Sequence, residues 1–87
     1  MKILYHRNFV KNYKKRIASN SKLVSKFKLQ LEILLENPSN SVLKNHRLIG
    51  QMVEYRSFSV TGDIRVIYRL KGKNILLYDI GSHNQVY

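Results

Sequence analysis

Two different patterns of hydrophobic and polar positions divide the chain. Between residues 7 and 36, apolar side chains recur every three or four positions, and neither Gly nor Pro interrupts them. This spacing predicts two amphipathic helices, over residues 7–17 and 21–36. Ser21 is the expected N-cap of the second helix. Pro38 ends that helix, because the residue before a proline is pushed out of the α region.

The second half of the chain is rich in Val, Ile, Tyr and Arg, which favours strands. Lys2–Tyr5 predicts a short first strand, and a loop is expected over 37–52. Three further strands, joined by Gly-containing turns, are expected at Val53–Val60, Ile64–Leu70 and Asn74–Ile80. We therefore expect one α+β domain over residues 1–87, in the order β-α-α-β-β-β. Its helical hairpin would cover one face of an antiparallel sheet and leave the other face partly open.

Length and composition exclude several classes of protein. A chain of 87 residues leaves room for one domain. It has no Cys, which rules out a disulfide framework, a thiolate nucleophile and a Cys-based zinc site. No apolar run approaches the length of a membrane span, and the first residues lack the core of a signal peptide. A cytoplasmic protein without a membrane partner is the expectation.

The charge of the chain is large and unevenly placed. The formal net charge is +11, and nine of the 16 Lys and Arg residues lie in residues 1–30, where no acidic residue occurs. Such a one-sided basic segment favours a polyanionic partner, namely RNA, DNA or an acidic protein. The alternative is a solvated helix face that keeps a small protein soluble.

Few side chains remain that could carry chemistry. Histidine suits proton transfer near neutral pH, but His6, His46 and His83 are too far apart in sequence to form a local metal-ligand motif. No phosphate-binding glycine loop is present, so neither metal nor cofactor is expected. Arg56 and Arg65 lie in predicted strands, either as ordinary solvent-face charges or, on an open sheet face, as a cradle for a phosphate.

Three blocks of sequence together resemble the RelE/ParE superfamily of bacterial toxins, and most closely its YafQ-like mRNA interferases. They are residues 45–50, 55–68 and 81–87, the last of which would otherwise be read as a frayed terminus. The resemblance implies a compact α+β fold and a ribosome-dependent endoribonuclease that cuts mRNA. It also implies a cognate antitoxin whose acidic or amphipathic segment wraps the toxin.

The resemblance carries over to individual positions. The YafQ-like pattern has a loop His, an acid in the second hairpin, and a tail with a His and a terminal aromatic residue. The RelE-like members add a strand Arg. The positions that match are His46, Asp63, His83, Tyr87 and Arg65. Two positions depart from the pattern: Ser59 stands where a His is usual, and Asp79 where an Arg is usual.

This resemblance suggests a mechanism in which RNA supplies its own nucleophile, the 2′-hydroxyl. The protein would then need only acid–base groups and phosphate stabilisation. His46 and His83 are the acid–base candidates. Asp63 would orient a His or act as a general base itself. Tyr87 would stack on a nucleobase of the RNA or donate a proton. The expected phosphate ligands are Arg56 and Arg65, and the expected contacts to ribosomal RNA are Lys14, Lys15 and Lys26.

Two other functions remain open from the sequence. A ParE-like toxin on the same fold would poison DNA gyrase without cutting RNA, and the departures at Ser59 and Asp79 leave room for it. A non-enzymatic RNA-binding module is the second alternative. The chain lacks the aromatic strand pattern of an RRM and the GXXG loop of a KH domain.

Overall fold

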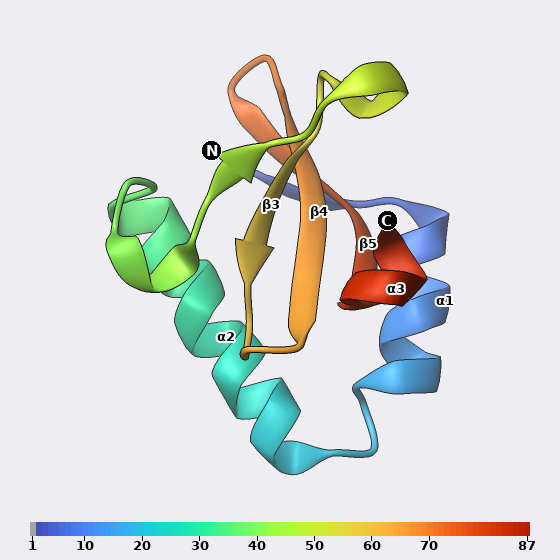
Figure 1. Cartoon of the computed structure of the whole chain (residues 1–87). Helices are drawn as coiled ribbons and strands as arrows, with labels where there is room; N and C mark the ends of the chain where they lie inside the picture. The colour runs from blue at the N-terminus through green and yellow to red at the C-terminus, as the bar shows by residue number, and fades with distance from the viewer. Residues whose placement is uncertain (1) are drawn as a thin grey trace.

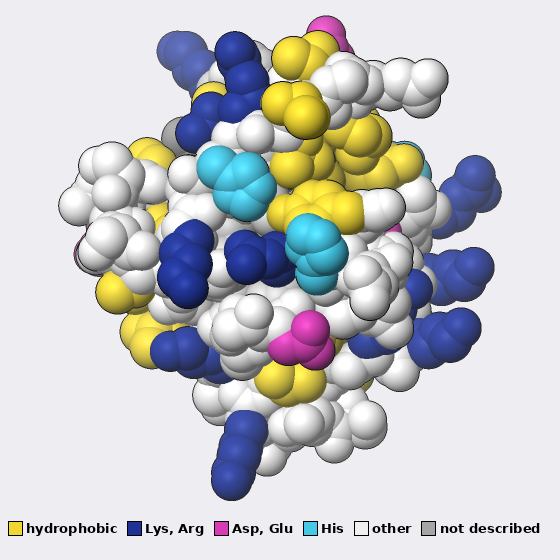
Figure 2. Space-filling view, viewed as in Figure 1, with side chains coloured by type: hydrophobic (Ala, Val, Ile, Leu, Met, Phe, Trp, Pro, Cys, Tyr) yellow, Lys and Arg dark blue, Asp and Glu magenta, His cyan; other side chains and the backbone are white. Residues whose placement is uncertain are grey.

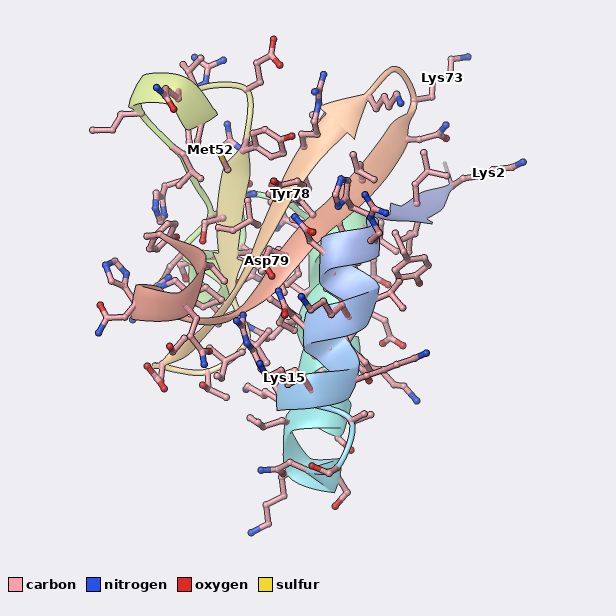
Figure 3. The ribbon with its side chains drawn as sticks, turned by 90° about the vertical axis from the view of Figure 1, so that its right-hand side faces the viewer. Lys2, Lys15, Met52, Lys73, Tyr78 and Asp79 are labelled. Atoms are coloured by element: carbon pink, nitrogen blue, oxygen red, sulfur yellow. The ribbon has the colours of Figure 1, made fainter. Side chains whose placement is uncertain are left out.

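A computed structural model describes residues 2–87 and shows two helices packed on one face of a five-stranded sheet (Figure 1). The strands are β1 (Ile3–Tyr5), β2 (His46–Arg47), β3 (Arg56–Ser59), β4 (Ile64–Lys71) and β5 (Asn74–Ser82). Figures 1 and 3 show α1 (Arg7–Arg16) and α2 (Ser21–Glu36) behind the sheet, and the short α3 (His83–Val86) in front of it. The expected α+β class, with a helical hairpin on one face, is confirmed.

Side-chain caps begin both long helices. The Nδ1 atom of His6 accepts a hydrogen bond from the backbone N–H of Asn8 at 3.0 Å, so this histidine has a structural role. Asn20, rather than the expected Ser21, caps α2, because its extended backbone lets the side chain accept from the N–H groups of Lys22 and Leu23. Within residues 2–87, no helix has the length and apolar character that crossing a membrane requires.

The sheet has the order β1-β5-β4-β3-β2 and is mixed. The neighbouring pairs among β2 to β5 are antiparallel, as expected for strands joined by tight turns, whereas β1 pairs with β5 in parallel. The chain reaches the rest of the sheet from β1 only through two helices. A connection of that length permits parallel pairing, which a hairpin cannot provide.

The hydrophobic core fills the space between the helices and the sheet. Its buried members include Phe9, Ile17, Phe27 and Leu34 from the helical layer and Phe58, Val66, Leu77 and Ile80 from the strands. One polar residue lies among them. The side-chain amide of Gln30 donates to the backbone carbonyl oxygens of Val42 (3.1 Å) and Ser59 (2.9 Å), so α2 satisfies acceptors of the neighbouring loop and of β3.

The segment expected to be a loop contains short ordered elements. Besides β2, it forms two 3₁₀ turns, η1 (Ser41–Leu43) and η2 (Gly50–Met52). The turn after η2 continues until Tyr55, whose N–H donates to the carbonyl of Met52, so β3 starts at Arg56 and not at Val53 as expected. These turns bring residues 46–49 against the sheet.

Candidate active-site face

Alternate residues of β3 and β4 face away from the helices and form the front face of the sheet. His46 is the register partner of Ser57, and Ser59 is the partner of Arg65. Directly paired residues share a face of a sheet. Phe58, between the two serines, belongs to the core on the opposite side. His46, Ser57, Ser59 and Arg65 therefore lie on the front face.

The end of the chain folds onto this same face. The side chain of Gln85 accepts a hydrogen bond from the backbone N–H of Ser82 at 2.7 Å, which holds the single turn of α3. The Tyr87 hydroxyl donates to Oγ of the buried Ser57, and the His83 ring packs edge-on against the Tyr87 ring with centroids 4.5 Å apart. The tail is thus anchored to β3.

The two histidines of the expected site meet in one hollow. A depression of about 320 Å³ is lined by His46, His83 and Tyr87, together with residues 47–49. Figure 2 shows two histidine side chains close together on this face, with basic side chains and an acidic one nearby. Residues that are 37 positions apart in sequence therefore present their imidazoles to the same space.

His46 is oriented by the loop that precedes it. Its Nδ1 atom lies 3.0 Å from the carbonyl oxygen of Lys44, and Lys44 has a left-handed backbone (φ 48°) at the end of η1. A carbonyl only accepts, so the hydrogen bond assigns the proton of a neutral imidazole to Nδ1. The Nε2 atom then carries the free lone pair and can accept a proton.

Arg65 lies on the same face of the sheet as His46, and one of its N–H groups is engaged by a neighbouring side chain. Its Nη1 donates to Oγ of Ser59 at 2.8 Å. A guanidinium has five N–H donors, so this contact fixes the group and leaves others for a phosphate. Asp63 lies two residues earlier in the β3–β4 turn, where its side chain is exposed and its backbone N–H donates to the Thr61 hydroxyl.

Arg56 lies on the other face of the sheet. It pairs in register with Tyr68, a core residue, and its Nε donates to Oδ1 of Asn45 at 3.2 Å. The predicted phosphate cradle formed jointly with Arg65 is therefore wrong, because adjacent positions of β3 point to opposite faces and Arg56 is one residue out of phase with Ser57 and Ser59.

Asn45 and Ser57 are residues that the sequence analysis did not single out. The Asn45 side chain accepts from Arg56 and from the Tyr68 hydroxyl (2.9 Å), and donates to the carbonyl of Pro38 (3.1 Å). It thereby fixes the start of the segment that carries His46. The alternation of Ser57 and Ser59 with apolar neighbours was a signal for a polar sheet face, whereas nothing local marked Asn45.

The three expected RNA-binding lysines lie in different places. Lys14 borders an apolar groove between α1 and α2, and Lys15 lies at the end of α1 (Figure 3). Lys26, in contrast, borders a groove along β3 next to Ser59. Within residues 2–87, no group of three or more His, Asp or Glu side chains lies close enough together to bind a metal ion.

Comparison with known proteins decides the family. The profile described as "Bacterial toxin of type II toxin-antitoxin system, YafQ" matches residues 1–87, the whole chain. This protein belongs to the YafQ family of toxins. No curated protein sequence matches it significantly.

Solved structures of YafQ and related toxins have the same fold. YafQ from Escherichia coli strain BL21(DE3) is 27% identical over 99% of this chain and 97% of its own, with a TM-score of 0.84. The E. coli DinJ–YafQ toxin–antitoxin complex also matches, at 27% identity, 99% and 96% coverage and a TM-score of 0.82. A YoeB/ParE toxin from Agrobacterium tumefaciens is 21% identical over 95% and 99%, with a TM-score of 0.82, and supports the fold alone.

Ser59 and Asp79, the two residues that depart from the YafQ pattern, both form side-chain contacts in this chain. Ser59 holds the Arg65 guanidinium, as described above. The Asp79 carboxylate accepts from Nδ2 of Asn12 at 2.7 Å and lies 3.8 Å from Nη1 of Arg16, so it ties β5 to α1 (Figure 3). Register places Asp79 on the same face of the sheet as Ser57, through Ile67, but its carboxylate is engaged by α1 and it is not among the residues that line the hollow of His46 and His83.

Proposed function

We propose that this YafQ-family toxin is a metal-independent endoribonuclease that cleaves mRNA on the ribosome, in the cytoplasm. The observation that carries the proposal is the convergence of His46, His83 and Tyr87 on one hollow, with Arg65 on the same face of the sheet. Two imidazoles and a guanidinium on one surface are suited to acid–base chemistry at a phosphodiester.

The reaction needs no nucleophile from the protein. The 2′-oxygen of the RNA attacks the adjacent phosphorus, its proton passes to a base, and the bond from phosphorus to the 5′-oxygen breaks. The leaving 5′-oxygen takes a proton from an acid, and the product carries a 2′,3′-cyclic phosphate. His46 and His83 divide the two proton transfers, each typically worth about 10²–10⁴-fold in rate. The exposed lone pair on Nε2 supports His46 as the base.

The remaining site residues stabilise and position the RNA. Arg65 would bind the pentacoordinate phosphorane, where a preorganised donor contributes about 3–4 kcal/mol. Tyr87 would stack its ring on a nucleobase of the RNA, because its hydroxyl proton is already donated to Ser57. Asp63, exposed in the turn before Arg65, is the candidate to orient a histidine or the 2′-hydroxyl.

A cognate antitoxin is the proposed protein partner. An apolar groove of about 430 Å³ between α1 and α2 is lined by Tyr5, Phe9, Tyr13 and Phe27, and Lys14 and Lys28 lie at its border. These features fit an amphipathic segment that carries acidic residues. A neighbouring gene that encodes a small acidic protein, and whose co-expression relieves growth arrest, would support this partner.

The function is tested by mapping cleavage sites on a translated message with purified ribosomes. The wild-type protein is expected to cut in phase with codons. His83→Ala is expected to cut at least about 100-fold more slowly, since it removes one proton-transfer group. Should wild-type protein leave the message intact and instead trap complexes of gyrase with cleaved DNA, the nuclease proposal fails in favour of a ParE-like activity.

A further inference from the structure

A polar groove runs along β3, beside the front face of the sheet. The strand β2 has two residues and pairs only with Arg56 and Ser57, so the rest of β3 has no strand neighbour on that side. A groove of about 190 Å³ lies there, between α2, η1 and the β3–β4 turn. Its lining includes Ser59, whose hydroxyl accepts a hydrogen bond from Arg65 on the front face, so the groove borders the strand that also carries the proposed reaction site.

Two lysines flank this groove. Lys26 comes from α2, and Lys44 comes from the left-handed turn after η1. Both side chains are exposed, and neither forms an ion pair within residues 2–87. No acidic residue in the described part of the chain lines the groove, and Asp63, which follows the groove residue Gly62 in the turn, is exposed.

The basic surface continues from the groove along α2. A second, shallow hollow contains both Lys26 and Lys22, which lie one helical turn apart. Figure 2 shows basic side chains below and to the left of the two histidines, on the side where Figure 1 places α2. Lys26 thus belongs to both hollows and joins Lys44 of the groove to Lys22 of the helix.

We propose that this groove, which we name the β3-edge groove, binds the backbone phosphates of the RNA strand that flanks the scissile phosphodiester. Its chemistry favours a nucleic acid over a protein segment. The groove offers two ammonium groups and the hydroxyl-bearing residue Thr61, whereas the aromatic surface suited to a peptide lies between α1 and α2. The inference rests on the proposed function, because it takes the substrate to be RNA.

The test measures binding and not cleavage. A fluorescent ten-nucleotide RNA with 2′-O-methyl groups has no free 2′-hydroxyl and cannot be cut, so its affinity is independent of catalysis. In the variant that combines Lys26→Gln and Lys44→Gln, we expect affinity at low salt to fall about 10-fold. We also expect the slope of log K against log salt to decrease by about 1.4, the value for two lost phosphate contacts on a single strand.

The matched control combines Lys71→Gln and Lys73→Gln. It removes the same charge from the β4–β5 hairpin, at the other end of β4 (Figure 3 labels Lys73). Lys26→Gln alone, at an exposed helix position, provides a second variant if the double variant unfolds. Equal affinities and slopes in the groove and control variants would overturn the proposal, as would a wild-type protein that does not bind this RNA. Failure of the function itself would instead appear as the absence of message cleavage.

Discussion

Hydrogen bonds to neighbouring groups determine which side-chain atoms of this protein remain free for chemistry. The Lys44 carbonyl leaves Nε2 of His46 free, and Ser59 fixes Arg65 while leaving guanidinium donors available. The two aspartates contrast in the same way. Asp79 is engaged by α1, whereas Asp63 projects from a turn into solvent. The same side-chain type is structural at one position and available for chemistry at the other.

This contrast predicts different effects of the same substitution. Asp79→Ala leaves Asn12 and Arg16 without their half-buried partner, so the free energy of unfolding should fall by about 1–3 kcal/mol. Asp63→Ala should change it by less than about 0.5 kcal/mol, as at other exposed sites. Urea denaturation followed by circular dichroism measures both values. Equal losses of stability would show that Asp79 does not tie β5 to α1.

At the scale of elements, α3 depends on a close approach to β5. A Cβ atom on Gly81 would lie 2.6 Å from Nη1 of Arg16 and 2.7 Å from Oε1 of Gln85, both below any normal contact distance. Gln85 holds the first turn of α3, and Arg16 donates to the carbonyl of Ile80. A Cβ atom at position 81 would therefore displace these two side-chain ends and break the hydrogen bonds that they make.

Gly81→Ala is accordingly expected to break the hydrogen bond between Gln85 and Ser82 and so to loosen α3 and the His83 and Tyr87 side chains that it positions. We expect a loss of stability of about 1–3 kcal/mol, as for other overpacked sites, and message cleavage reduced at least about 10-fold. Asn84→Ala is the control, because it changes an exposed side chain of the same turn without adding an atom next to Arg16 or Gln85. Cleavage rates and thermal unfolding of both variants provide the comparison. Normal cleavage by Gly81→Ala would show that the position of α3 does not matter for the reaction.

At the scale of the whole molecule, the positive charge is distributed over distinct surfaces. Lys14 and Lys28 border the apolar groove between the helices, while Lys26 and Lys44 flank the β3-edge groove. Arg65 lies on the front face. A net charge of +11 raises the encounter rate with any polyanion, but the surfaces differ in the contacts that they offer.

The charge on α1 predicts how the toxin associates with ribosomes. Reversing Lys14 and Lys15 together to Glu should weaken association at 0.1 M salt by at least about 10-fold and make it less sensitive to salt, since contacts with ribosomal RNA phosphates are lost. Co-sedimentation with ribosomes over a salt series measures this effect. Unchanged affinity would mean that α1 does not contact the ribosome.

The sequence by itself determined the elements and their class. Helical and strand periodicity located both long helices and the meander of β3 to β5, because these patterns depend on neighbours along the chain. The resemblance selected the residues of the front face. Their chemical roles stay predictions.

Only the tertiary structure decided which side chains share a surface. Whether Arg56 and Arg65 lie on the same face of the sheet depends on the register across the β3–β4 hairpin. In this register Arg56 lies on the face that the helices cover, and Arg65 lies on the front face. The parallel pairing of β1 and the anchoring of Tyr87 on Ser57 likewise join distant segments. Contacts of this kind are set by packing of the folded chain, so local sequence patterns do not predict them.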